Sequence, residues 1–303
     1  MQSRLPMIFI LLTVVLDSMG IGLIMPVMPD LIQSLEGGDL GQAALWGGVL
    51  ATIFAVMQFL FGPTIGSISD RFGRRPVLLI ALVVMSFDYV LMAVAGTIWL
   101  LVIGRIIGGI TAATQSTASA YMADISKPED KAANFGLIGA AFGIGFVIGP
   151  MLGGILAEYG TRAPFWAAAV LAGANGIFGY FALPETVTDR IRRPFDIKRA
   201  NPLGAFKSIT QLPDLGRFMI ISFVISLAFF VYPSVWAYFG KLQFGWGPGM
   251  IGLSLGAFGI GIAIVQGLLM RPILNKIGER NAVVLGLSVD VLAFIMLGFV
   301  TNG

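Results

Sequence analysis

The sequence predicts an all-α integral membrane protein, and its composition is the first reason. Of the 303 residues, 57% are hydrophobic and only 12% are charged, whereas soluble globular chains carry about 25% charged residues. The mean hydropathy of +0.89 agrees with this. Several apolar runs also reach the ~20 residues that a helix needs to cross the ~30 Å bilayer core, and they lack the alternating pattern of a membrane barrel.

Nine apolar runs predict nine spanning helices. A polar stretch with Pro194 and Pro202 separates the sixth run from the seventh and predicts a solvated linker. We therefore expect a six-helix N-terminal bundle over residues 1–184, a cytoplasmic linker over 185–217 and an incomplete, three-helix C-terminal bundle over 218–303. The predicted helices cover residues 7–27, 44–66, 76–95, 98–122, 134–157, 164–184, 218–240, 249–269 and 281–300.

The basic residues predict that the N-terminus is cytoplasmic. Of the 19 Lys and Arg residues, one lies inside a span and only Arg162 and Lys241 lie outside, so the other 16 face the cytoplasm. The first outer loop is instead acidic, with Asp30, Glu36 and Asp39. Because cytoplasmic loops of membrane proteins carry an excess of Lys and Arg, no other orientation fits comparably well.

A weak internal repeat relates the two parts of the chain. The segment "WGGVLATIF" opens the second span and "MIGLSLGAF" opens the eighth, while "FGRRPVLL" and "IGERNAVVL" follow those spans. Two related halves are typical of transporters, and the second half here lacks three helices. The chain is therefore expected to be a fragment or a truncated gene product. The matched residues, all 205 positions apart, are Gly47 with Gly252, Gly73 with Gly278, and Arg75 with Arg280.

Four ionisable residues lie inside the predicted spans: Asp17, Asp88, Arg105 and Asp290. Each costs about 2.5–3.5 kcal/mol at a helix centre, and such residues normally face a bundle interior or a water-filled cavity. An ion pair between Arg105 and one of the acids could serve only to hold helices together. One Arg cannot neutralise three carboxylates, so we expect at least one acid to be protonated or to pair with a substrate. Such an acid can exchange a proton against a cationic substrate.

The sequence has no Cys and no His. Disulfides, thiol nucleophiles and Cys/His metal sites are therefore excluded, and proton chemistry near neutral pH falls to carboxylates. A net charge of +3 is too small to imply a nucleic-acid partner. No nucleophile–base pair and no phosphate-binding loop is visible in the sequence, so we do not expect an enzyme.

A polar motif, "GPTIGSISDRFGRRPVL", covers residues 62–78 between the second and third spans. The small Gly66 predicts a close approach of helices, and Gly73 predicts a tight turn into the third span. Asp70 can cap the positive end of a neighbouring helix or pair with a cytoplasmic Arg. An ionic latch of this kind can hold one face closed. Alternatively, the loop only sets topology through its positive charges.

The fourth span, "LVIGRIIGGITAATQSTASAYMADI", has two informative features. Arg105 stays charged in the membrane, so it can hold a nearby acid ionised or expel its proton. Small and hydroxyl residues from Thr111 to Ala120 predict a face that lines a cavity. A packing face fits these residues equally well.

The fifth span contains a Gly-rich segment, "GFVIGPMLGG", at residues 145–154. Gly145 and Gly149 predict a close-packing face. Pro150 removes a backbone donor and bends the helix. Gly153 and Gly154 keep the bend thin, so that a neighbouring helix can slide past. Ordinary small-residue packing is the alternative interpretation.

These motifs resemble those of the major facilitator superfamily. Residues 66–75 resemble its G-x-x-x-D-R-x-G-R-R signature, and residues 145–154 resemble its antiporter signature G-x-x-x-G-P-x-x-G-G. Across all nine spans the chain resembles the tetracycline-efflux group of drug–proton antiporters, through segments such as "LDSMGIGLIMPVMP", "SFDYVLMA" and "LGLSVDVLAFIML". The resemblance implies the major facilitator fold, here with a six-helix N-terminal half and three helices of an incomplete C-terminal half.

The resemblance also implies a function: proton-coupled efflux of a small amphipathic drug by alternating access in the bacterial inner membrane. The family's substrate is tetracycline chelated to a divalent metal. The expected partners are therefore the drug, protons and lipid, with no nucleic acid and no cofactor beyond a metal that travels with the substrate.

Site residues follow from the resemblance position by position. The family's three required acids match Asp17, Asp88 and Asp290. The implied substrate and proton pathway consists of Asp17, Gln58, Asp88, Arg105, Gln266 and Asp290. The implied gating motif consists of Gly66, Asp70, Arg71, Gly73, Arg74, Arg75 and Asp124, and the implied antiporter motif of Gly145, Gly149, Pro150, Gly153 and Gly154.

One position departs from the family's pattern. The family usually carries a His in the eighth helix, four residues before the glutamine, and Ile262 stands there in this chain. Since Ile cannot take a proton, either the proton path or the substrate differs. Two alternatives therefore remain beside drug efflux: a truncated, non-transporting membrane protein, and an exporter or symporter of an unrelated metabolite.

Overall fold

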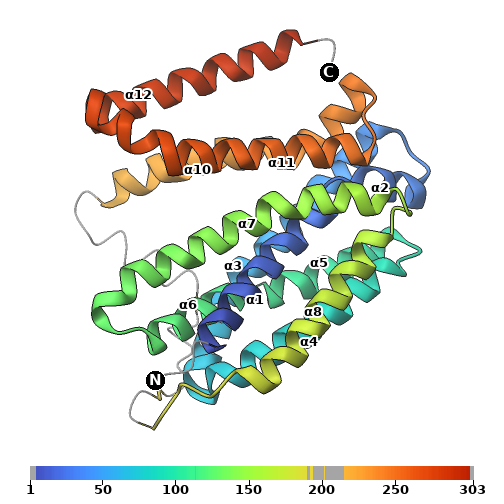
Figure 1. Ribbon diagram of the computed structural model, residues 1–303. Coiled ribbons are helices and arrows are strands. Elements are labelled where there is room, and N and C mark those ends of the chain that lie inside the picture. Colours follow the sequence, from blue (N-terminus) through green and yellow to red (C-terminus); the bar gives the residue numbers. More distant parts are fainter. Residues whose placement is uncertain (1–4, 113, 190–191, 194–200, 202–214, 301–303) are drawn as a thin grey trace.

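The computed structural model describes residues 5–112, 114–189, 192–193, 201 and 215–300. Over these residues the chain is helical throughout, with no strand, as Figure 1 shows. The helices are α1 (Leu5–Ile24), α2 (Met28–Glu36), α3 (Leu40–Phe72), α4 (Arg74–Ala93), α5 (Ile98–Thr111), α6 (Thr114–Ile125), α7 (Lys131–Ala157), α8 (Ala163–Ala182), α10 (Leu215–Phe244), α11 (Pro248–Ile264) and α12 (Met270–Phe299). A 3₁₀ turn (Pro128–Asp130) precedes α7, and a π-helical turn (Val265–Leu269) joins α11 to α12.

The described residues contain nine helical segments that are long and apolar enough to cross a membrane, as the sequence predicted. Three of them are composite: α5 and α6 together make the fourth, the 3₁₀ turn with α7 makes the fifth, and α11 with the π-helical turn makes the eighth. Helix α12 covers Met270–Phe299, but the non-helical residue Gly278 divides it at a kink, and the part after Gly278 begins close to the predicted start at residue 281. Most of the predicted linker, 190–191, 194–200 and 202–214, lies outside the described residues.

The short helix α2 lies in the segment that the sequence predicts to be the first outer loop. It has helix signals at both ends: Pro29 in its first turn, and Gly37 as a left-handed C-cap with a φ of 64°. Its own residues Leu31 and Ile32 are fully buried. The helix is amphipathic and only 9 residues long, which is too short to register in a search for spanning segments.

Helix α1 runs through the middle of the first eight helices and packs against α7 and α8 (Figure 1). Its two ends enter two different apolar clusters. Leu23 joins the cluster beside α2, which we call the Asp30 end of the molecule. Phe9 joins the cluster at the opposite end, which we call the Arg74 end because α4 begins there. Asp17 therefore lies between two apolar cores.

Helices α10, α11 and α12 lie along one side of the others (Figure 1). A small cluster that includes Trp236 and Ile251 joins α10 to α11. At the Asp30 end, Lys241 of α10 forms an ion pair with Asp30 of α2. The Nζ atom of Lys241 also donates a hydrogen bond to Gln33 Oε1 at 2.6 Å. This polar contact joins α10 to α2.

Candidate functional site

A cavity of about 50 Å³ lies among α1, α3, α4, α5, α6 and α7. Its wall contains Asp17, Gln58, Asp88 and Arg105, which are four of the six predicted pathway residues. They come from four different helices, and the hydropathy pattern of the sequence does not show how those helices pack against one another. The structure therefore gathers the predicted charges of the first, third and fourth spans in one place. We call this space the charged cavity.

Arg105 does not pair with either acid of the charged cavity. Among the described residues, no ion pair joins it to Asp17 or Asp88, so the helix-fastening alternative finds no support. Its Nη2 atom instead lies 3.1 Å from the sulfur of Met92, and its guanidinium carbon lies 5.6 Å from the centre of the Phe54 ring. A contact of this kind with an aromatic face stabilises a buried cation without neutralising it.

Both acids are left without a full set of hydrogen bonds. Within the described residues, Oδ1 of Asp17, Oδ1 of Asp88 and Nε of Arg105 are buried and have no hydrogen-bond partner. The Asp88 side chain is only 4% exposed. Leaving buried polar atoms unpaired costs free energy, so an arrangement of this kind needs a ligand, a proton or water to complete it.

Glycines of α5 make room for Asp88. A Cβ atom added at Gly104 would lie 3.0 Å from Asp88 Oδ1, and one added at Gly108 would lie 2.8 Å from Oδ2. These distances are shorter than ordinary carbon–oxygen contacts, so any side chain there would displace the carboxylate. Because Gly104 and Gly108 have no side chains, the Asp88 carboxylate can lie close to the α5 backbone.

Several residues that line the charged cavity are not among the predicted site residues, and Tyr89 and Gln115 are two of them. Tyr89 lines it from α4, one position after Asp88, and Gln115 lines it from α6. Gln115 belongs to the stretch from Thr111 to Ala120, for which lining a cavity and packing were equally good interpretations. Among the small and hydroxyl residues of that stretch, Ala112 also lines the charged cavity, as the first interpretation predicts. The neighbouring Thr117, by contrast, is fully buried.

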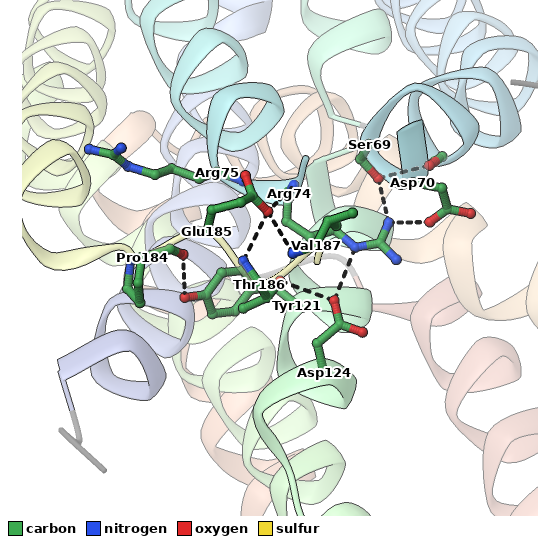
Figure 2. A network of polar contacts seen from close by, with 11 residues as sticks. Ser69, Asp70, Arg74, Arg75, Tyr121, Asp124, Pro184, Glu185, Thr186 and Val187 are labelled. Carbon is green, nitrogen blue, oxygen red and sulfur yellow. Dashed lines mark hydrogen bonds and ion pairs between the residues drawn. The ribbon is translucent and has the colours of Figure 1, made fainter. Parts of the chain in front are cut away.

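The polar network at the Arg74 end joins α3, α4 and α6 (Figure 2). Arg74 forms an ion pair with Asp70, and its Nε atom lies 3.3 Å from Asp124 Oδ2. Its Nη1 atom donates a hydrogen bond to Ser69 Oγ at 2.6 Å. Of the two predicted roles of Asp70, pairing with an Arg is therefore confirmed, and Arg74 is the partner.

Glu185, rather than Asp70, caps the nearby helix. Its carboxylate accepts hydrogen bonds from the backbone N–H groups of Arg74 at 2.9 Å and Arg75 at 3.2 Å, which are the first residues of α4 (Figure 2). A negative charge at a helix N-terminus is stabilised by the helix dipole. Gly73, with a φ of 112°, makes the predicted tight turn, and a Cβ atom there would collide with the Glu185 carboxylate.

The remaining residues of the gating motif differ in their surroundings. The prediction that Gly66 allows a close helix approach is wrong, because no described atom lies within 4 Å of a Cβ built there. Arg75 donates a hydrogen bond to the Tyr180 carbonyl at 2.8 Å and lies over the ring of the same residue. Arg71 lies over the ring of Phe72, its neighbour in the chain.

The comparison with known proteins agrees with this geometry. Residues 10–303 match the Major Facilitator Superfamily. The chain belongs to this superfamily. It is 42% identical over 303 residues to the tetracycline resistance protein of class C from Escherichia coli. This alignment covers 100% of this chain and 76% of that protein. It is 38% identical over 298 residues to the class G tetracycline resistance protein from Vibrio anguillarum. That alignment covers 98% of this chain and 75% of that protein.

Solved structures show the same fold. The human organic anion transporter MFSD10 (TETRAN) superposes with a TM-score of 0.69 and 24% identity, over 88% of this chain and 72% of that one. The chain is therefore a multi-pass membrane transporter of the major facilitator superfamily and not an enzyme.

In this superfamily member, the antiporter motif packs on two helices at once. A Cβ atom added at Gly149 would lie 2.5 Å from the Met19 carbonyl oxygen of α1, and Gly145 and Gly153 meet α1 equally closely. On the other side, a Cβ atom added at Gly154 would lie 2.7 Å from the Pro248 carbonyl oxygen of α11. The predicted close-packing face is confirmed, and α7 remains one helix through Pro150.

Gln266 and Asp290 are not brought to the charged cavity. Gln266 lies in the π-helical turn, and Asp290 lies on α12; both are exposed among the described residues. π-Helical turns inside α-helices often occur at functional sites, so the position of Gln266 is notable in a transporter of this superfamily. Ile262 lies one turn before it on α11.

Proposed function

We propose that this protein exports a small amphipathic drug, with tetracycline as the leading substrate, in exchange for protons. The observation that carries the proposal is that Asp17 and Asp88 each hold a buried Oδ1 atom without a hydrogen-bond partner among the described residues, in a cavity that also holds Arg105. Two carboxyl groups beside an unpaired cation can change their protonation when a positively charged ligand arrives or leaves. The similarity to proteins named for tetracycline resistance supports the choice of substrate.

In the proposed cycle, Asp17 and Asp88 bind protons and release them as the transporter alternates between two openings. The charged cavity has room for a few water molecules, each of which needs roughly 10–15 Å³ of accessible volume, so water can carry protons to both acids. Asp290 and Gln266 are proposed to complete the pathway from the second half. The drug travels as a metal chelate, and no resident cofactor is proposed.

We propose the bacterial inner membrane as the location, with the N-terminus and the Arg74 end in the cytoplasm. The excess of Lys and Arg on that side supports this orientation. Residues 1–184 and 218–303 are proposed to belong to the two halves, joined by a linker over 185–217. The ion pairs of Arg74 with Asp70 and Asp124 would then fasten the cytoplasmic ends of α3, α4 and α6.

The test is uptake of tetracycline with Mg²⁺ into inverted membrane vesicles that contain the transporter expressed from its complete gene. Asp17→Asn and Asp88→Asn are expected to abolish uptake driven by a proton gradient. Glu129→Gln, at an exposed acid in the turn before α7, is the control and should leave uptake unchanged. Gradient-driven uptake that survives both Asp substitutions would contradict the proposal.

A panel of drug susceptibilities in a sensitive host separates substrates. Protection against tetracyclines alone supports the leading substrate. A flat panel favours an unrelated metabolite, for which Ile262 in place of the family's His would be the first residue to investigate. A chain that inserts and folds but carries no substrate at all would favour the non-transporting alternative.

A further inference from the structure

A wider groove adjoins the charged cavity. It has a volume of about 320 Å³, and α3, α6 and the residue that ends α5 form its wall. Three residues, Gln58, Ala112 and Gln115, belong to both the groove and the charged cavity. The two spaces are therefore neighbours that meet at the side chains of two glutamines. The lining residues are Gln58, Gly62, Ala112, Gln115, Ser116 and Ser119.

The two spaces differ in size. Pockets that bind drug-sized molecules usually measure roughly 300–1,000 Å³, and the groove, at about 320 Å³, is shallow and open, so it can cover only part of such a molecule. The charged cavity, at about 50 Å³, is too small for the body of such a molecule. In this conformation only a proton, water or the charged tip of a ligand fits beside Asp17 and Asp88.

The two spaces also differ in chemistry. The groove is lined by amide and hydroxyl side chains and contains no ionisable residue. Amides and hydroxyls both donate and accept hydrogen bonds, so they suit uncharged carbonyl, amide and hydroxyl groups of a ligand. The Gln58 amide is weakly engaged, since its Nε2 atom lies 3.5 Å from the Ala112 carbonyl oxygen. A hydrogen bond of that length is easily exchanged for a better one.

We propose that this groove is a binding subsite for the uncharged, oxygen-rich part of the substrate, with Gln115 as its main specificity residue. The charged cavity then receives only the positive charge or the proton. This inference rests on the proposed drug export and divides its site in two. Gln115 is exposed at the junction of the two spaces, where it can contact both parts of one ligand.

Transport kinetics in inverted vesicles test the division. We expect Gln115→Leu, which keeps the size but removes the amide, to raise the KM for tetracycline about tenfold and to leave the maximal rate nearly unchanged. Gln115→Asn should recover part of the affinity. Asp17→Asn should show the opposite pattern, with gradient-driven turnover lost. An unchanged KM in Gln115→Leu, with uptake intact, overturns the inference alone. Absence of uptake by the unaltered transporter overturns the proposed function instead.

Thiol labelling provides a second, independent test, because the chain has no native Cys. Ser119→Cys exchanges one small side chain for another inside the groove, and a membrane-impermeant maleimide should modify it in inverted vesicles. Saturating tetracycline with Mg²⁺ should slow the modification at least fivefold. Ser86→Cys is the matched control and should resist modification, since the Ser86 hydroxyl bonds to the Ala169 carbonyl between α4 and α8. Rapid modification of Ser119→Cys that tetracycline does not slow overturns the inference, and so does a complete lack of modification.

Discussion

Gly73 and Gly278, which lie 205 positions apart, both have a positive φ, of 112° and 75° respectively. Residues with a side chain rarely adopt such angles, so each glycine marks a turn that other residues would strain. Gly73 separates α3 from α4, and Gly278 interrupts α12. The internal repeat is therefore seen in the backbone conformation as well as in the sequence, because matching positions of the two segments make the same kind of turn.

The two glycines should respond differently to Ala. Gly278→Ala meets open space in the described structure, so only the strain of a backbone conformation that is essentially restricted to glycine, about 1–3 kcal/mol, is expected. Gly73→Ala adds a collision with the Glu185 carboxylate and should lower the apparent melting temperature in detergent further. Equal losses in the two variants would show that the contact with Glu185 is unimportant.

Removal of the Glu185 cap should destabilise the Arg74 end. Glu185→Ala loses two hydrogen bonds to the α4 N-terminus as well as a favourable charge, and we expect a loss of about 1–2 kcal/mol. Glu185→Gln keeps one acceptor oxygen and should lose less. Unfolding in detergent measures both, with Glu129→Ala at an exposed position as the control. A neutral Glu185→Ala would contradict the capping role.

Arg74 should not be replaceable by Lys. Its Nη1 atom contacts both Asp70 and Ser69 while its Nε atom contacts Asp124, and a single ammonium group cannot reproduce two separate donor atoms. We expect Arg74→Lys to lose about 1 kcal/mol of stability and to reduce the coupling measured between positions 74 and 124 in a double-mutant cycle. A full coupling energy in the Lys variant would argue that charge alone matters here.

The glycines of α7 should divide into packed and free positions. Gly149→Ala would press on the Met19 carbonyl oxygen, so we expect lower thermal stability and lost transport. Gly143→Ala, in the same helix, meets no described atom within 4 Å and should gain stability of about 0.5–1 kcal/mol from better helix propensity. Tolerance of Ala at Gly149 with full transport would mean that α1 and α7 can separate freely.

The sequence predicted the spanning helices because hydropathy is a local property, and it missed α2 because a short amphipathic helix leaves no long apolar run. It also identified Asp17 and Asp88, since a charge in an apolar run is visible without a structure. The place of Arg105 was not predictable, because its contacts with Met92 and Phe54 depend on how three helices meet.

Contacts between distant backbone groups were equally hidden. Glu185 accepts hydrogen bonds from backbone N–H groups about 110 positions earlier in the chain. Every residue except Pro has a backbone N–H group, so no side-chain pattern in the sequence points to this contact. The role of Gly66 was inferred from a spacing that fits close packing elsewhere, yet its surroundings are open. Small residues show where helices can approach and not where they do.

The seating of α7 has a mechanical consequence. At Gly149 and Gly153 its backbone lies against that of α1, and at Gly154 it lies against that of α11, so main chain meets main chain at these three positions. Where two backbones are in direct contact, no side chain can change its rotamer to accommodate a displacement of one helix. At these positions a displacement of α1 is transmitted to α7 and on to α11 with little absorption by side chains, which links the two sets of helices mechanically.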